Sequence, residues 1–147
     1  MNVRKIMKSL HKDMITNITA LSKKAYPDIQ AIYLFGSYAD KTHHIKSDID
    51  IALLLPVLQA KQEGSLAMNK LRFELEELLH RTVDLINLRQ VSTVLQKEVT
   101  TKGKRILTCD QYASEEFEML TLSFYQKLND FLDFTDCILR YGEHKKN

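Results

Sequence analysis

Three short apolar runs constrain the fold of this chain most. They read IQAIYLFG (29–36), DIDIALLL (48–55) and TVDLINL (82–88). Each is too short for a buried helix, and each is bounded by glycine, proline or polar residues. Such runs are typical of buried strands, so the chain predicts a sheet built around them.

Helical patterns separate these strands along the chain. The sequence predicts helices over 3–24, 65–80 and 91–102, and Gly103 ends the last of them. The run KRILTC (104–109) predicts a short edge strand. The order helix, strand, strand, helix, strand, helix, strand, helix predicts a small α/β (α+β) domain. Its mixed sheet would be flanked by helices.

The C-terminal region predicts one long amphipathic helix over 110–142. Its large apolar residues recur at steps of three and four: Phe117, Leu120, Phe124, Leu128, Phe131, Phe134, Ile138 and Tyr141. Two interpretations follow from this pattern. The apolar face packs on its own domain, or it binds a partner protein or a second copy of the chain.

Composition excludes several classes of protein. Of the 147 residues, 44% are hydrophobic, so the chain can bury a core and is not expected to be disordered. A net charge of +2 predicts no direct binding to nucleic acid. No run approaches the roughly 20 apolar residues of a membrane span, and no signal peptide is recognised. With Cys109 and Cys137 isolated, we expect a soluble cytoplasmic protein.

Acidic residues interrupt two of the predicted core strands. Asp48 and Asp50 share one strand face, because alternate residues of a strand point the same way. Two close carboxylates repel each other, and a divalent cation such as Mg²⁺ relieves that repulsion. Asp84 stands between Val83 and Leu85, where a third carboxylate would complete a two-metal site for phosphoryl-type transfer.

Each of these features has a simpler explanation when taken alone. A single aspartate in or beside a strand is usually a cap, an edge residue or half of an ion pair, and Gly36–Ser37 could merely begin a turn. Together they favour a site. A glycine lets the backbone approach a ligand, while N–H groups and the Ser37 hydroxyl can hold phosphate oxygens.

The combined pattern resembles a known signature. Gly36, Ser37, ten intervening residues and then Asp48-Ile49-Asp50 match the GSx10DxD signature of the DNA polymerase β-like nucleotidyltransferase superfamily. The small size and VLQKEVTTKGKRIL (94–107) resemble its minimal nucleotidyltransferase (MNT) branch. Many MNT proteins are antitoxins encoded beside a HEPN-domain ribonuclease toxin. The resemblance covers about residues 20–108, the expected core of one domain spanning 1–147.

The resemblance implies a role for each of these residues. Asp48 and Asp50 would hold the two Mg²⁺ ions that bind a nucleoside triphosphate. Asp84 would ligate the catalytic metal and help activate the acceptor hydroxyl, while Gly36 and Ser37 would contact the β- and γ-phosphates. In the antitoxin branch the donor would be ATP and the acceptor a tyrosine hydroxyl of the toxin, which would receive AMP.

The segment after Gly-Ser departs from the resemblance. Many relatives carry an arginine there, whereas this chain reads YADKTHHIK (38–46). Lys41 or Lys46 would then supply the positive charge, and Lys46 is our candidate for nucleotide binding. We interpret His43 and His44 as exposed loop residues, because adjacent histidines in a loop seldom ligate one ion.

Two other functions remain as alternatives. An antitoxin could act by binding and occluding its toxin without catalysis. A small-molecule nucleotidyltransferase of the aminoglycoside-modifying kind is less favoured, because 147 residues leave little room for a second domain that would build an acceptor pocket. The expected partner is the HEPN toxin, in a hetero-oligomer, with a homodimer as a further possibility.

Overall fold

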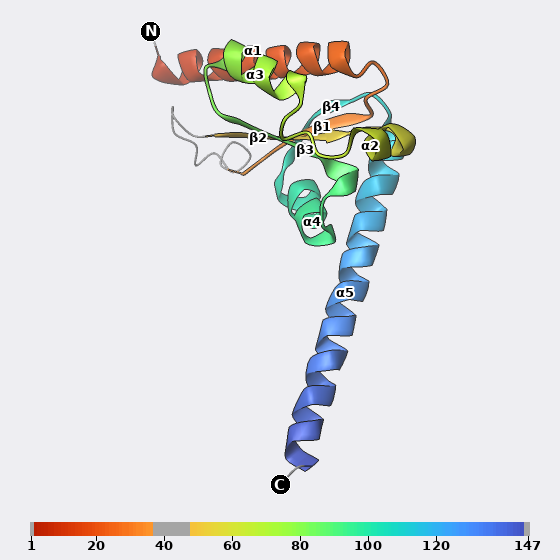
Figure 1. The fold of residues 1–147 in the computed structure, drawn as a ribbon. Helices are drawn as coiled ribbons and strands as arrows, with labels where there is room; N and C mark the ends of the chain where they lie inside the picture. The colour runs from red at the N-terminus through yellow and green to blue at the C-terminus, as the bar shows by residue number, and fades with distance from the viewer. Residues whose placement is uncertain (1, 37–47, 146–147) are drawn as a thin grey trace.

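The computed structural model describes residues 2–36 and 48–145. It consists of a four-stranded sheet with helices on both faces and a long C-terminal helix that leaves the domain (Figure 1). The elements in chain order are α1 (Val3–Ala25), β1 (Ala31–Phe35), β2 (Ile49–Leu54), α2 (Val57–Glu63), α3 (Lys70–Leu79), β3 (Val83–Asn87), a 3-10 turn η2 (Leu88–Gln90), α4 (Thr93–Lys102), β4 (Lys104–Thr108) and α5 (Gln111–Lys145).

The sheet is mixed, as the sequence predicts. Its strand order is β3-β2-β1-β4, with β1 antiparallel to both β2 and β4, and β2 parallel to β3. The edge position predicted for residues 104–109 is confirmed. The prediction of a core strand over 82–88 is wrong in one respect, because β3 forms the other edge of the sheet. An edge strand tolerates an exposed Asp84, since one of its sides has no neighbouring strand.

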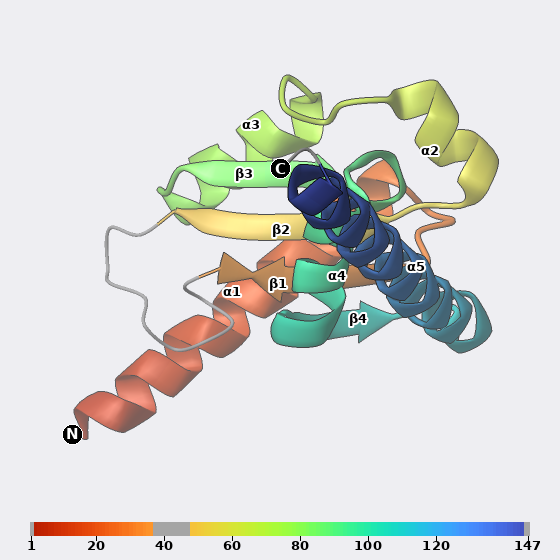
Figure 2. The ribbon, with the colours of Figure 1, turned by 90° about the horizontal axis from the view of Figure 1, so that it is seen from below.

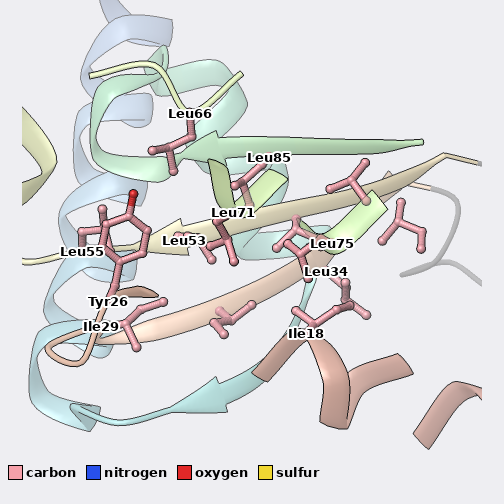
Figure 3. Packing of buried hydrophobic residues seen from close by; sticks show 14 of the residues in the cluster. Ile18, Tyr26, Ile29, Leu34, Leu53, Leu55, Leu66, Leu71, Leu75 and Leu85 are labelled. Atoms are coloured by element: carbon pink, nitrogen blue, oxygen red, sulfur yellow. The ribbon is translucent and has the colours of Figure 1, made fainter. Parts of the chain in front are cut away.

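The larger core lies on the face covered by α1 and α3. Because side chains alternate along a strand, Ile49, Ile51 and Leu53 of β2 all point to this face. Figure 3 shows their neighbours in this core, among them Ile18 of α1, Leu71 and Leu75 of α3, and Leu34, Leu85, Tyr26 and Ile29. Burial of this apolar surface is the main stabilising term for the sheet and both helices.

A smaller core lies on the opposite face, under α4 and the first turns of α5 (Figure 2). Tyr33 of β1 and Ala52 of β2 pack there against Val99 of α4 and Phe117 of α5. The Tyr33 hydroxyl donates to Glu118 Oε1 at 2.6 Å, and Arg105 pairs with the same oxygen at 3.2 Å. These contacts fix the direction in which α5 leaves the sheet.

The sequence misplaces one helix start and misses a short helix. The predicted helix over 65–80 begins at Lys70, because the Asn69 side chain accepts a hydrogen bond from the Leu71 N–H at 2.8 Å and caps it. Leu66 is buried from an irregular segment before that cap. The missed helix α2 follows Pro56 and buries only Ala60, so it carries no apolar period to detect.

The long helix α5 packs on its own domain only near its start, so the interpretation of self-packing is confirmed for that part alone. Near its start, Ser114, Phe117 and Thr121 are buried against the domain. The distal part extends away from the sheet (Figure 1) and exposes a series of large apolar side chains: Phe124, Phe131, Leu132, Phe134, Ile138, Leu139 and Tyr141. Across the described ranges, no helix combines the length and apolar character that a membrane span requires.

Candidate active site

The end of β1 and the starts of β2 and β3 meet at one edge of the sheet. This follows from the antiparallel pairing of β1 with β2 and the parallel pairing of β2 with β3 (Figure 2). In register, Asp50 lies between Phe35 of β1 and Asp84 of β3. The two acidic strand positions that the sequence singles out are therefore neighbours, although 33 residues separate them along the chain.

Asp50 and Asp84 share one face of the sheet. Val83 and Leu85 fill the core under α1 and α3, so Asp84 points to the α4 side, and the same alternation directs Asp50 there. Asp50 is half-buried, whereas Asp48 and Asp84 are exposed. The inner carboxylate is therefore partly withdrawn from water, and its two acidic neighbours remain open to solvent.

The ionised form of Asp50 is disfavoured in the metal-free protein. Burial, together with the negative charges of Asp84 and Asp48, raises its pKa from 3.8 to about 6. A divalent cation would remove this penalty, and carboxylates are the ligands that Mg²⁺ prefers, so the donor set fits the ion. Within residues 2–36 and 48–145, no three acidic, histidine or cysteine side chains already form a group that could hold a metal ion.

Gly36 lies directly against the carboxylate of Asp50. Its φ of +68° lies in the left-handed region that glycine adopts at little cost. A Cβ atom placed on Gly36 would stand 2.1 Å from Asp50 Oδ2, which no real contact allows. A larger residue here would therefore displace the Asp50 carboxylate and would also strain the backbone. The other predicted residues of this segment, Ser37, Lys41, His43, His44 and Lys46, lie outside the described residues.

Asp48, Asp50 and Asp84 lie at one end of the strands, which we call the carboxylate edge. A cavity of about 310 Å³ adjoins it. It is lined by Phe35 and Gly36 from the end of β1 and by Glu98 and Lys102 from α4. Glu98 and Lys102 form an ion pair with 3.2 Å between Lys102 Nζ and Glu98 Oε1. Neither residue was predicted from the sequence, because a glutamate and a lysine four positions apart on a helix form an ordinary solvent-exposed ion pair.

The sequence matches a family of nucleotide-transferring enzymes. The model of the family described as "Polymerase beta, Nucleotidyltransferase" matches residues 16–112, which include all three carboxylates. The chain belongs to this nucleotidyltransferase family. The predicted superfamily and fold are thereby confirmed, and the carboxylate edge lies within the matched region.

Similar proteins narrow the relationship within the family. The protein adenylyltransferase MntA of Shewanella oneidensis is 42% identical over 111 residues, which cover 76% of each chain. A crystal structure of a toxin–antitoxin pair with AMP-PNP superposes with a TM-score of 0.66 and 35% identity, covering 85% of this chain and 98% of the other. The MNT antitoxin resemblance predicted from the signature is therefore confirmed.

A further solved structure contains a modified toxin. It is that of the tri-AMPylated Shewanella oneidensis HEPN toxin in complex with its MNT antitoxin. The matched chain in that structure has a TM-score of 0.63 and 32% identity, with 87% of this chain and 98% of the other covered. The family model, the curated relative and the solved structures therefore agree on the family and on its antitoxin branch.

Proposed function

We propose that this protein is an antitoxin that transfers AMP from ATP to a tyrosine hydroxyl of a cognate HEPN ribonuclease toxin. One observation carries the proposal. A chain 42% identical to a protein adenylyltransferase holds three aspartates at one sheet edge, with Asp50 between Gly36 and Asp84. The arrangement suits transfer of a phosphoryl-type group, because it concentrates negative ligands where metal-bound phosphates would lie.

The proposed chemistry is an in-line displacement. The tyrosine oxygen attacks the α-phosphorus of ATP, a bond from that oxygen to phosphorus forms, and the bond from phosphorus to the bridging oxygen breaks. Pyrophosphate leaves, and the hydroxyl proton passes to a carboxylate, for which Asp84 is our candidate. When bound, Mg²⁺ would neutralise charge on the phosphates, so few protein groups are needed beyond those that position the reactants.

The proposed roles of the remaining residues follow from their places. Asp48 and Asp50 would ligate Mg²⁺, and the left-handed Gly36 leaves room for Asp50 while bringing backbone close to the nucleotide. We keep Gly36 and Ser37 as proposed contacts of the β- and γ-phosphates, and Lys46 as a proposed nucleotide-binding residue. A single domain, 1–147, would carry the whole activity, with its core over about 20–108.

Inhibition of the toxin would follow from charge and size. AMP on a tyrosine adds a negative phosphate and a bulky nucleoside. Beside a ribonuclease site that must accept anionic RNA, this group would repel and obstruct the substrate. The exposed thiols of Cys109 and Cys137, with no disulfide among the described residues, agree with the cytoplasmic location that such a partner and ATP require.

The decisive experiment measures AMP on the toxin. Mixing the chain with ATP, Mg²⁺ and its cognate HEPN toxin should give mass increments of AMP on the toxin. The double variant Asp48→Asn/Asp50→Asn should reduce the transfer rate by at least about 10³-fold, because it removes the proposed metal ligands. Omission of Mg²⁺ should have a similar effect.

A matched control removes the same charge elsewhere. The variant Asp13→Asn/Asp28→Asn changes two exposed aspartates, one in α1 and one in the turn that follows it. It should transfer AMP at the wild-type rate. If the Asp48/Asp50 variant also transfers at that rate, the assignment of the site is wrong.

A second candidate function, neutralisation by binding alone, is favoured by the distal part of α5. Its large apolar side chains are more than half exposed, with Phe131 at 63% and Phe134 at 64%. A helical segment that packs on nothing is only marginally stable in water, so a partner is expected to cover it. We propose that the HEPN toxin docks on this face, since solved relatives are complexes with such toxins.

Two variants separate binding from catalysis. If Asp48→Asn/Asp50→Asn still protects cells from the toxin while no AMP is found on it, occlusion is sufficient. Phe131→Ser/Phe134→Ser should weaken the complex with the toxin by about 10- to 100-fold, because two aromatic anchors are lost. Wild-type affinity in this variant would place the docking surface elsewhere.

A further inference from the structure

The cavity beside the carboxylate edge contains a basic residue with no role in the proposed site. Lys102 stands at the end of α4, and its side chain is 70% exposed. Phe35 and Gly36 form the opposite wall of the cavity. Among the described basic residues, Lys102 is the one that lines this cavity. The cavity therefore presents a positive charge within reach of the Gly36 backbone.

The cavity and the carboxylate site are continuous. Gly36 belongs to both, because it lines the cavity and its Cα lies directly against Asp50. The cavity also lies on the side of the sheet to which Asp50 points, since α4 covers that face. A triphosphate held at the aspartates would have its unreacted phosphates close to this space.

Lys102 forms an ion pair with Glu98 that a phosphate group could replace. Its ion pair with Glu98 joins neighbouring turns of one helix, and both side chains are largely exposed, at 70% and 48%. Exposed pairs of this kind contribute little to stability, so a phosphate can replace the carboxylate at small cost. An ammonium group binds phosphate as a strong point charge.

We infer that Lys102 is a phosphate-binding residue of the nucleotide site. It exchanges Glu98 for the β- and γ-phosphates when a nucleoside triphosphate binds. The inference rests on the proposed function and deepens it. Lys102 would add a positive charge from α4 to the one proposed for Lys46.

The test compares binding of two nucleotides by isothermal titration calorimetry in the presence of Mg²⁺. AMP-PNP carries the β- and γ-phosphates, and AMP does not. Lys102→Met should weaken AMP-PNP binding by about tenfold, because a charge-assisted contact is lost, and should change AMP binding by less than about twofold. Lys102→Arg should retain AMP-PNP binding within about threefold of wild type.

Two variants on the same helix serve as controls. Lys97→Met removes an equal charge from a lysine that lies 4.9 Å from the Tyr125 ring of α5, away from the cavity. It should leave AMP-PNP affinity unchanged. Glu98→Gln removes the resting partner and a nearby negative charge, so it should strengthen AMP-PNP binding by about twofold.

The outcomes distinguish this inference from the proposed function. The role of Lys102 is refuted if wild type and Lys102→Met bind AMP-PNP with equal affinity. It is also refuted if the substitution weakens AMP binding as much as AMP-PNP binding. In both cases the proposed function stands. If the wild type with Mg²⁺ binds no AMP-PNP, the proposed function fails and the inference fails with it. A selective loss of AMP-PNP, rescued by arginine, supports the inference.

Discussion

The carboxylate edge of the sheet and the distal part of α5 depart from ordinary burial in opposite ways. At the edge, a carboxylate is half-buried beside two others, and its pKa rises to about 6. Along distal α5, large apolar side chains that a core would bury are exposed. Both arrangements cost stability in the isolated chain, because burial disfavours charge and water disfavours apolar surface.

The comparison indicates what each region is suited to bind. A cation would neutralise the excess negative charge and could bring bound phosphates with it. Another protein would bury the exposed apolar surface. Departures from the rules of folding are expected at functional sites, where the missing ligand completes the structure. The three predictions below test whether these two regions behave as distinct sites, starting with the largest expected effect.

The first prediction compares two phenylalanines of α5 that are 14 residues apart. Phe117 is 8% exposed and packs in the smaller core, whereas Phe131 is 63% exposed. Phe117→Ala should lower the free energy of unfolding by about 3–4 kcal/mol, and Phe131→Ala by less than about 0.5 kcal/mol. Urea denaturation of the chain without its partner measures both values.

An equal loss in the two variants would erase the distinction between the parts of α5. In particular, a large loss at Phe131 would mean that the distal face is already covered in the isolated protein, by a second copy of the chain. Repeating the measurement over a range of protein concentrations tests that case, because a dimer becomes more stable as concentration rises.

The second prediction concerns Gly36. Gly36→Ala should reduce AMP transfer by about 100-fold, because the new methyl group displaces Asp50 from its position. Gly64→Ala is the matched control, since Gly64 has a similar φ of +60° with nothing within 4 Å of its added Cβ. Both variants should lose about 1–3 kcal/mol of stability from backbone strain, but only the first should lose activity.

Transfer rates and urea midpoints of the two variants check this prediction together. If Gly64→Ala loses as much activity as Gly36→Ala, strain in the backbone is the cause, and the contact with Asp50 has no special role. Binding of the toxin should be unaffected in both, because neither glycine lies in α5.

The third prediction follows from the raised pKa of Asp50. A carboxyl group whose pKa is higher in the folded state binds a proton more tightly there, so its protonation favours folding. In the metal-free protein, stability from this group should be greatest near pH 4 and should be lost as pH rises through about 6. After allowance for partial exposure, the loss is about 1–2 kcal/mol.

Asp50→Asn should remove this pH dependence and stabilise the metal-free protein at pH 7.5. Denaturation in EDTA at pH 4.5 and pH 7.5 measures the effect, with Asp13→Asn as a control that keeps the wild-type profile. Addition of Mg²⁺ should stabilise the wild type at pH 7.5 and leave Asp50→Asn almost unchanged. The same stabilisation in both proteins would contradict a metal site at Asp50.

Much of the fold was predictable because the signals are local. The apolar runs in β1 and β2 are short and bounded, and the sheet that they form is mixed, as predicted. Helix α2 was not predictable, since it buries only Ala60. The edge position of β3 was also missed. Leu85 and its apolar neighbours resemble a central strand, and the sequence does not show whether another strand pairs on each side.

The residue types of the site could be predicted from the sequence, but the burial of Asp50 and the position of Lys102 could not. Spacing alone indicated that Asp48 and Asp50 share a face, and the signature linked them to Gly36. The half-burial of Asp50 depends on strands to either side of it, so no local pattern reports it. Lys102 was missed for the same reason, since its approach to Gly36 is made only when α4 packs on the sheet.

The sequence by itself determined the family, the fold class and the carboxylates, because these depend on residue order and short periods. The tertiary structure decided which carboxylate has a raised pKa, that Gly36 lies against that carboxylate, and which part of α5 is left exposed. The physical reason is that burial and electrostatic repulsion depend on neighbours distant in sequence. The helical period of α5 runs unchanged from Phe117 to Tyr141, and only packing separates its buried part from its exposed one.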